Sequence, residues 1–214
     1  MTNRLAGVAA AMLGAAMVWA PAQAQAQARA PAQQAAVTPA TWEGEAKAFV
    51  QGLVAELSAI SGNASLAAAE EQRALEAVLA RNLAVRQMGG ILLGGARSSA
   101  TPEQLAEYNR LVPAFLAHSF ASQIDDLVAQ NLTLGDATTR SAREVIVTTS
   151  FVRRSNKTTV KVNWRVIKEG EKLKLVDASV NGVSKLTVQR EEFSSLLRNQ
   201  GFDGLLAHMR SAVA

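Results

Sequence analysis

Few side chains in this chain have the type and spacing that catalysis or metal binding requires. The two histidines, His118 and His208, are far apart in sequence, and neither has a Glu or Asp at a metal-ligand spacing. The acidic pairs Asp125-Asp126 and Glu191-Glu192 are adjacent residues, whose side chains do not share a helix face. The chain has no cysteine. We therefore expect no catalytic residue, no metal site and no cofactor, and we favour a protein that holds an apolar ligand without transforming it.

The remaining polar groups have structural explanations. Asp177 stands near the end of an expected strand, before Gly182, and we expect its carboxylate to accept backbone hydrogen bonds there. A basic strand face is typical of a solvated sheet surface, although it would also suit anionic head groups or a partner. Its residues are Lys157, Lys161, Arg165, Lys172 and Lys174. The net charge of +4 is mildly basic and does not favour nucleic-acid binding.

The N-terminal residues 1–24 have the pattern of a secretory signal peptide. Arg4 precedes the apolar run Leu5–Ala20, and Ala22-Gln23-Ala24 is a small-x-small cleavage site. Cleavage after Ala26 or Ala28 would fit equally well. An uncleaved anchor is the alternative, but the run is shorter than the roughly 20 apolar residues that a membrane span needs. We therefore expect export to the periplasm.

Residues 25–40 are rich in Ala, Gln and Pro and are expected to form a low-complexity linker. The remaining residues, 41–214, are enough for one domain with a substantial core. Apolar residues at spacings of three and four predict helices over residues 42–60, capped by Thr41, and over residues 65–85. A short buried helix is expected at Met88–Leu93, before two glycines.

A long helix is predicted after Ser99. Thr101 and Gln104 form a capping box around Pro102 at the first helical position. The apolar spacing continues through Ile124, Leu127 and Val128. We expect Pro113 to kink or split this helix, because proline removes a backbone donor.

After Gly135 the apolar period changes from that of a helix to that of a strand. Strands are predicted over Glu144–Arg154, 158–166 and Lys172–Val180, with an additional short strand at Leu132–Leu134. The short turns between them imply an antiparallel sheet. One face of this sheet is apolar, so helices must cover it, and the fold class is α+β with helices segregated on one side of a curled sheet.

The tail from Lys172 to Arg210 reads as a strand, a glycine turn and two amphipathic helices split by Gly201. It resembles the C-terminal end of the MlaC (toluene-tolerance) family of periplasmic phospholipid-binding proteins. In that family a D-V-x-V-x-G-V-S turn precedes an R-x-x-F-x-x-(I/L)-(I/L)-R-x-x-G-x-(D/E)-G-L pattern. The matching residues are Asp177, Ala178, Val180, Gly182, Val183, Ser184, Arg190, Phe193, Leu196, Leu197, Arg198, Gly201, Asp203, Gly204 and Leu205.

The resemblance extends upstream, over about Trp42 to Arg210. Leu92-Leu93-Gly94 and Ala100–Gln104 match the segment that precedes the family's long helix. Arg97 stands where the family usually has Trp, Leu83-Ala84 replaces a Phe-Asp pair, and Pro113 is atypical. The chain therefore resembles a diverged member.

The resemblance implies a highly twisted antiparallel sheet, similar to that of NTF2 or cystatin folds, and helices that enclose an apolar lipid cavity. It also implies a carrier that moves phospholipid between an inner-membrane ABC transporter complex and an outer-membrane lipoprotein complex. The candidate lipid-binding residues are Val145, Val147, Phe151, Val160, Val162, Trp164, Val166, Leu173, Leu175, Met88, Tyr108 and Phe115.

Other interpretations fit the same residues. An apolar sheet face suits a filled core as well as a cavity wall. A carrier for another lipid, such as a hopanoid, is the first alternative, and a periplasmic scaffold subunit with a filled core is the second. An enzyme on such a sheet is disfavoured, because the strands lack a combination of His, Asp and Tyr.

Overall fold

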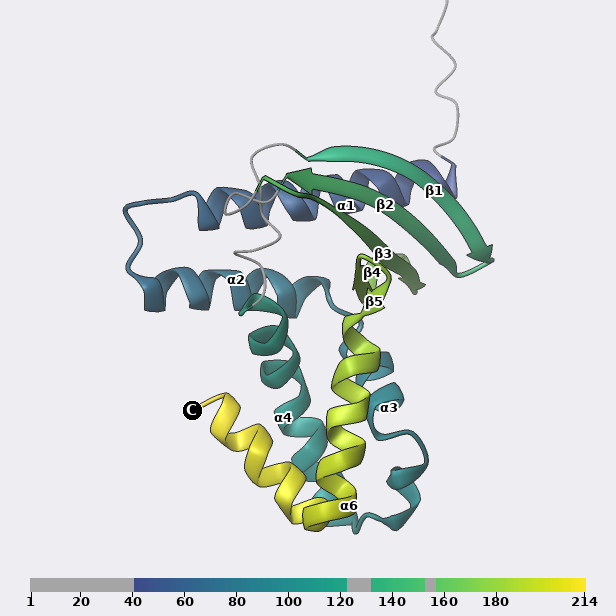
Figure 1. The fold of residues 1–214 in the computed structure, drawn as a ribbon. Coiled ribbons are helices and arrows are strands. Elements are labelled where there is room, and N and C mark those ends of the chain that lie inside the picture. Colours follow the sequence, from purple (N-terminus) through teal and green to yellow (C-terminus); the bar gives the residue numbers. More distant parts are fainter. Residues whose placement is uncertain (1–40, 123–131, 153–156) are drawn as a thin grey trace, which may run out of the picture. The chain divides into compact units, whose positions relative to one another are not determined.

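The computed structural model describes residues 41–122, 132–152 and 157–214, which lie in one compact unit, Pro39–Ala214. Helices come first and strands follow, before a last long helix (Figure 1). The helices are α1 (Trp42–Ser61), α2 (Ala68–Asn82), α3 (Val85–Leu93), the 3₁₀ helix η1 (Gly94–Ser99), α4 (Pro102–Ala121) and α6 (Lys185–Ala212). The strands are β1 (Thr133–Ser141), β2 (Glu144–Val152), β3 (Thr159–Glu169), β4 (Lys172–Val180) and β5 (Val183–Ser184).

The five strands form one antiparallel sheet in sequence order. Strand β2 pairs with β3 without interruption, so that Val147 faces Trp164 and Phe151 faces Val160. The alternating apolar residues of these two strands are buried on one face, as the period of two predicts. Strand β1 is longer than the short strand expected at Leu132–Leu134, and β5 was not expected.

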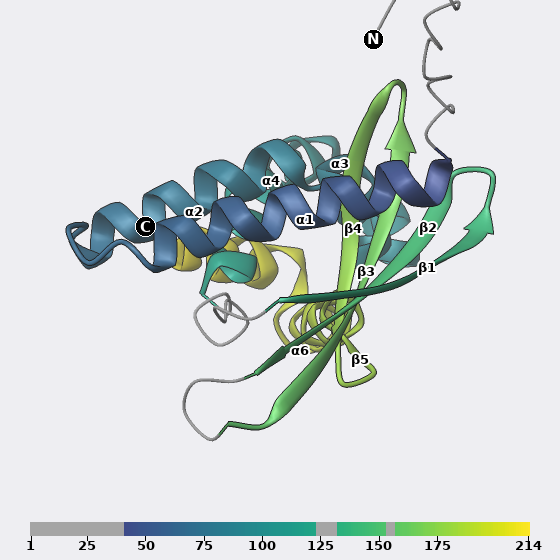
Figure 2. The same cartoon turned by 90° about the horizontal axis from the view of Figure 1, so that it is seen from above.

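All described helices lie on one side of the sheet, which confirms the predicted α+β class. Helix α1 runs along β1 and β2, while α3 and α6 contact β4 (Figures 1 and 2). Helix α2 packs between α1 and α4, and α4 in turn packs on α6. The apolar face of α1 is therefore buried on both the sheet and α2, whereas that of α4 is buried on other helices.

Two helix ends follow the predicted capping chemistry. Thr41 Oγ1 accepts a hydrogen bond from the backbone N–H of Gly44 at 3.1 Å. In α4, the backbone N–H of Gln104 donates to Thr101 Oγ1 at 3.2 Å, and that of Thr101 donates to Gln104 Oε1 at 3.0 Å. Both interactions satisfy first-turn donors that a helix leaves unpaired.

The structure corrects the predicted junction between α2 and α3 and excludes a split of α4 at Pro113. Val85 begins α3 and does not end the preceding helix, because Leu83 is extended and bridges to Leu175 while the N–H of Ala84 donates to the Leu175 carbonyl. Pro113 lies within α4 without splitting it. The apolar residues on both sides of Pro113 are buried, and this packing holds the helix together despite the missing donor. The expected continuation through Ile124, Leu127 and Val128 lies outside the described residues.

The junction between β4 and α6 is held by Asp177. This carboxylate is buried and accepts hydrogen bonds from the backbone N–H of Leu186 at 3.0 Å and from Ser184 Oγ at 2.7 Å. The structural role expected for Asp177 is therefore confirmed. Gly201, with φ of 68°, interrupts α6 at the predicted position, and this left-handed conformation favours glycine. Among the described helices, none has the length and hydropathy of a membrane span.

Candidate functional site

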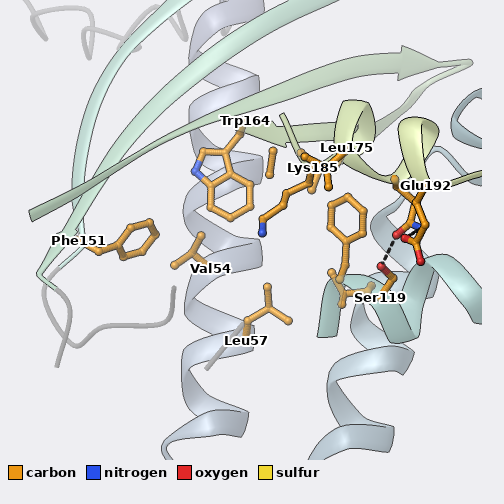
Figure 3. Close-up of a pocket in the computed structure, with 13 residues that line it drawn as sticks. Val54, Leu57, Ser119, Phe151, Trp164, Leu175, Lys185 and Glu192 are labelled. Atoms are coloured by element: carbon orange, nitrogen blue, oxygen red, sulfur yellow. Dashed lines mark hydrogen bonds between the residues drawn. The ribbon is translucent and has the colours of Figure 1, made fainter. Parts of the chain in front are cut away.

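An apolar pocket of about 150 Å³ lies between the sheet and the helices (Figure 3). The sheet forms one wall, α1 and α2 form a second, and α4 and the first turns of α6 complete it. Most of the lining is hydrocarbon, and the polar side chains come only from α4 and α6. The lining residues are Val54, Leu57, Leu79, Ser119, Phe120, Phe151, Trp164, Leu175, Ala178, Lys185, Val188, Gln189 and Glu192.

The aromatic wall is positioned by the strand register. Phe151 and Trp164 project from the same face of β2 and β3 toward α1 (Figure 3). The indole Nε1–H of Trp164 donates to the buried hydroxyl of Thr149 at 2.8 Å, so its one polar group is satisfied within the wall. The ring is thus fixed with its apolar surface available to the pocket.

A chain of polar contacts runs along the α4–α6 side of the pocket. Ser119 Oγ donates to Gln189 Oε1 at 2.9 Å, and Gln189 Nε2 donates to Glu192 Oε2 at 2.6 Å. The other carboxylate oxygen of Glu192 lies 3.3 Å from His208 Nε2. These contacts join α4 to both halves of α6 beside the pocket.

Only part of the predicted set meets at this pocket. Phe151, Trp164 and Leu175 line it. Five further predicted residues share the apolar face and are fully or almost fully buried, but they pack beside the pocket. These five are Val145, Val147, Val160, Val162 and Val166. Leu173 is half-buried at the start of β4.

The predicted helical residues lie away from this pocket. Met88 is fully buried in α3, and Tyr108 on α4 donates its hydroxyl to the Gly89 carbonyl at 2.9 Å. Phe115 contacts Phe193, with ring centroids 5.2 Å apart. Burial raises the pKa of Tyr108 well above its usual range. None of these three predicted residues lines the pocket.

Sequence reasoning missed the helical and polar parts of the wall. Val54 and Leu57 were recognised as core positions of α1, but no sequence signal indicated that a space lies opposite them. Lys185, Gln189 and Ser119 were not singled out, because isolated polar residues at helix positions are ordinarily solvated. The β4 residue Ala178, 3% exposed, leaves room at the wall because its side chain is small.

The basic strand face is partly neutralised by the protein itself. Arg165 donates to both carboxylate oxygens of Glu144, at 3.2 and 3.0 Å, and lies 3.9 Å from Asp177. Its hydrogen bond to Glu144 raises the pKa of Arg165. Lys174 donates to the backbone carbonyl of Arg81. Lys157, Lys161 and Lys172 are exposed.

A larger hollow of about 610 Å³ lies beside α3 and α4 and has a mixed wall of apolar and charged residues, which includes the predicted residue Tyr108. Arg86 on its wall is 3.4 Å from Glu169, and Arg97, the residue that replaces the family's usual Trp, also lines it. Its charged groups suit acyl chains less well than the hydrocarbon wall of the first pocket does. Within the part of the chain that the structure describes, no three His, Cys, Asp or Glu side chains gather to hold a metal ion.

Comparison with solved structures shows the same fold in a known lipid-binding protein. The chain is similar to the phospholipid-binding protein from Ralstonia solanacearum, whose structure was determined in complex with a phospholipid. The two superpose with a TM-score of 0.64 and 19% sequence identity, over 78% of this chain and 96% of that chain. Residues 48–211 match the model of the family described as MlaC protein. Because that match spans most of the chain, the protein belongs to the MlaC family.

Proposed function

We propose that this protein is a periplasmic lipid carrier that binds the acyl chains of a phospholipid in the pocket beneath Trp164. The observation that supports this proposal most directly is an apolar pocket between the sheet and the helices, lined by Phe151, Trp164 and Leu175. Membership of the MlaC family, and a structural neighbour that was solved with a phospholipid, support the choice of ligand. Most of the wall is aromatic and aliphatic, which favours the binding of hydrocarbon chains.

The energy of hydration explains why a carrier needs such a pocket. Each acyl CH₂ group that leaves water contributes roughly 0.8 kcal/mol, so a soluble carrier must enclose the chains almost fully. The same energy makes spontaneous release slow. Release therefore requires a change in the walls or a partner that accepts the chains.

The pocket must widen to take a complete phospholipid. Its volume of about 150 Å³ is smaller than the roughly 300–1,000 Å³ of pockets that bury drug-sized ligands. The walls come from α1, α4 and α6, which are held across the pocket by side-chain contacts rather than by backbone pairing. A small separation of α4 and α6 from the sheet would lengthen the pocket without disrupting any strand.

The proposal extends to location and partners. The signal-peptide pattern of residues 1–24 supports export to the periplasm, with residues 25–40 as a linker. In that compartment the carrier would receive lipid from, or deliver it to, an inner-membrane ABC transporter complex and an outer-membrane lipoprotein complex. The family relationship supports these partners.

Mass spectrometry of the purified mature protein tests the proposal directly. Native spectra report the mass bound to the intact protein, and solvent extraction followed by denaturing spectra identifies it. We expect about one phospholipid per protein, since the structure has a single hydrocarbon-lined pocket of this kind in its described part. A bound hopanoid would replace the proposed ligand with another lipid class. A protein without lipid, and unable to take any up from phospholipid vesicles, would favour a scaffold role.

A further inference from the structure

The pocket contains one cation whose position has no structural explanation. Lys185 is half-buried, and its side chain extends between Trp164 and Leu57 with the ammonium nitrogen directed into the pocket (Figure 3). A lysine at a surface helix normally turns its ammonium to water while its stem covers apolar atoms. Here the charge is directed toward the hydrocarbon wall.

No described residue neutralises this ammonium. Among the described residues that line the pocket, Glu192 is the sole carboxylate, and it is engaged by Gln189 and His208. Two other lysines do have partners: Lys168 lies 3.1 Å from Glu45 Oε2 and 4.6 Å from the ring centre of Trp42, and Lys174 donates to the Arg81 carbonyl. Lys185 thus keeps its hydrogen-bonding capacity for a ligand.

The position of Lys185 in its helix makes its unpaired positive charge still less favourable. It is the first residue of α6, where the helix dipole already places partial positive charge, so a lysine there is electrostatically unfavourable. The backbone N–H groups of Leu186 and Thr187 are already bound by Asp177 and Ser184. The ammonium, and not the helix end itself, is the donor that remains for an anion.

We propose that Lys185 binds the phosphate group of the lipid whose acyl chains occupy the pocket. This inference rests on the proposed function and names the part of the ligand that the pocket recognises. A phosphate accepts charge-assisted hydrogen bonds from lysine and would neutralise the ammonium. Every phospholipid carries that group, so Lys185 would distinguish phospholipids from neutral diacyl lipids without selecting among head groups.

The test compares Lys185→Met with Lys185→Arg and with Lys172→Met, a matched control at an exposed lysine on β4. Lipid affinity is measured from the change in tryptophan fluorescence as lipid is added, because Trp164 lies in the pocket wall and should respond to bound lipid. Circular dichroism confirms that each variant is folded. The probes are phosphatidylglycerol, phosphatidylethanolamine and diacylglycerol with identical chains, together with oleate and inorganic phosphate.

Lys185→Met should weaken binding of both phospholipids about tenfold, as expected for the loss of a charged hydrogen bond. Diacylglycerol binding should not change, Lys185→Arg should keep most of the affinity, and Lys172→Met should behave as wild type. Inorganic phosphate alone should bind weakly, because the chains supply most of the affinity.

Several outcomes would overturn the inference. Unchanged phospholipid affinity in Lys185→Met would exclude a phosphate contact, and an equal loss for diacylglycerol would assign Lys185 to the shape of the pocket. A larger loss for oleate would make a carboxylate the ligand, and inorganic phosphate binding as tightly as lipid would make the site one for free phosphate. A wild-type protein that binds neither phospholipid nor diacylglycerol would overturn the proposed function as well, and this pattern differs from the other four.

Discussion

The apolar face of the sheet and the contact between α4 and α6 bury the same kinds of side chain, but they differ in what lies opposite them. Between α4 and α6, Tyr108 makes edge-to-face contacts with Phe193 and Phe202, with ring centroids 6.4 and 6.3 Å apart. Helix α3 also approaches closely there, since a Cβ at Gly89 would lie 3.1 Å from Val112 Cγ1. Beneath Trp164, the facing helices leave a pocket.

This difference shows how a pocket can persist in a small domain. The aromatic cluster between α4 and α6 is close-packed and provides stability, while the wall beneath the sheet has fewer opposing atoms and can separate. Stability and ligand binding are thus assigned to neighbouring but distinct sets of apolar residues. Substitutions in the two regions should therefore have different consequences.

The largest expected effect is on stability. Phe193→Ala removes a fully buried ring from the close-packed region and should lower the free energy of unfolding by about 3–5 kcal/mol. Urea unfolding measures this loss, with Val188→Ala, at a side chain that is 49% exposed, as the control. The folded fraction should still bind lipid. A loss below about 1 kcal/mol would mean that the region is not close-packed.

The second prediction fills the pocket. Ala178→Phe places a ring in the space beneath Trp164, and it should lower lipid affinity more than about tenfold, since several acyl CH₂ groups lose their place. Stability should change little, because the ring enters an existing space. Ala55→Phe, at an exposed position of α1, controls for the added aromatic group. The amount of lipid bound per protein is measured after solvent extraction. If folded Ala178→Phe bound as much lipid as the wild type, the ligand would have to occupy another part of the protein.

A third prediction concerns alkaline pH. Burial raises the pKa of Tyr108, so the folded state keeps the phenol proton that the unfolded chain loses above its ordinary pKa of about 10. The free energy of unfolding should therefore be unaffected below that pH and should fall as the pH rises above it. Tyr108→Phe should remove this component while costing about 1 kcal/mol at neutral pH for the lost hydrogen bond to Gly89.

This tyrosine is the chain's only one, so tyrosinate absorbance reports it without ambiguity. The pH dependence of urea unfolding is compared between wild type and Tyr108→Phe, which cancels the titration of lysines and arginines. Identical slopes in the two proteins above about pH 10 would show that Tyr108 titrates as freely as in water.

The smallest expected effect is on the rate of lipid uptake. Gln189→Ala removes the hydrogen bond to Ser119 that joins α4 to α6 beside the pocket. Uptake from vesicles should become about two- to fivefold faster, which corresponds to roughly one neutral hydrogen bond. Asn199→Ala, farther along α6 on its exposed side, is the control. Unchanged uptake would show that these two helices do not need to separate.

Much of the fold could be predicted because its signals are local. The alternation in β2 and β3, the capping box at Thr101 and the break at Gly201 each depend on residues close in sequence. The predictions that were wrong involve contacts between distant segments. Leu83 ends α2 because it bridges to Leu175, and α4 continues through Pro113 because buried neighbours on both sides hold it.

The sequence by itself determined the α+β class, the buried face of the sheet and the family, since periodicity and short motifs carry that information locally. It did not separate Phe151, Trp164 and Leu175, which line the pocket, from Met88, Tyr108 and Phe115, which fill a core. Both sets are apolar and recur at the spacing of their element, so the pattern is the same. The tertiary structure decided between them, because a cavity is defined by the distance to facing atoms, and helices remote in sequence set that distance.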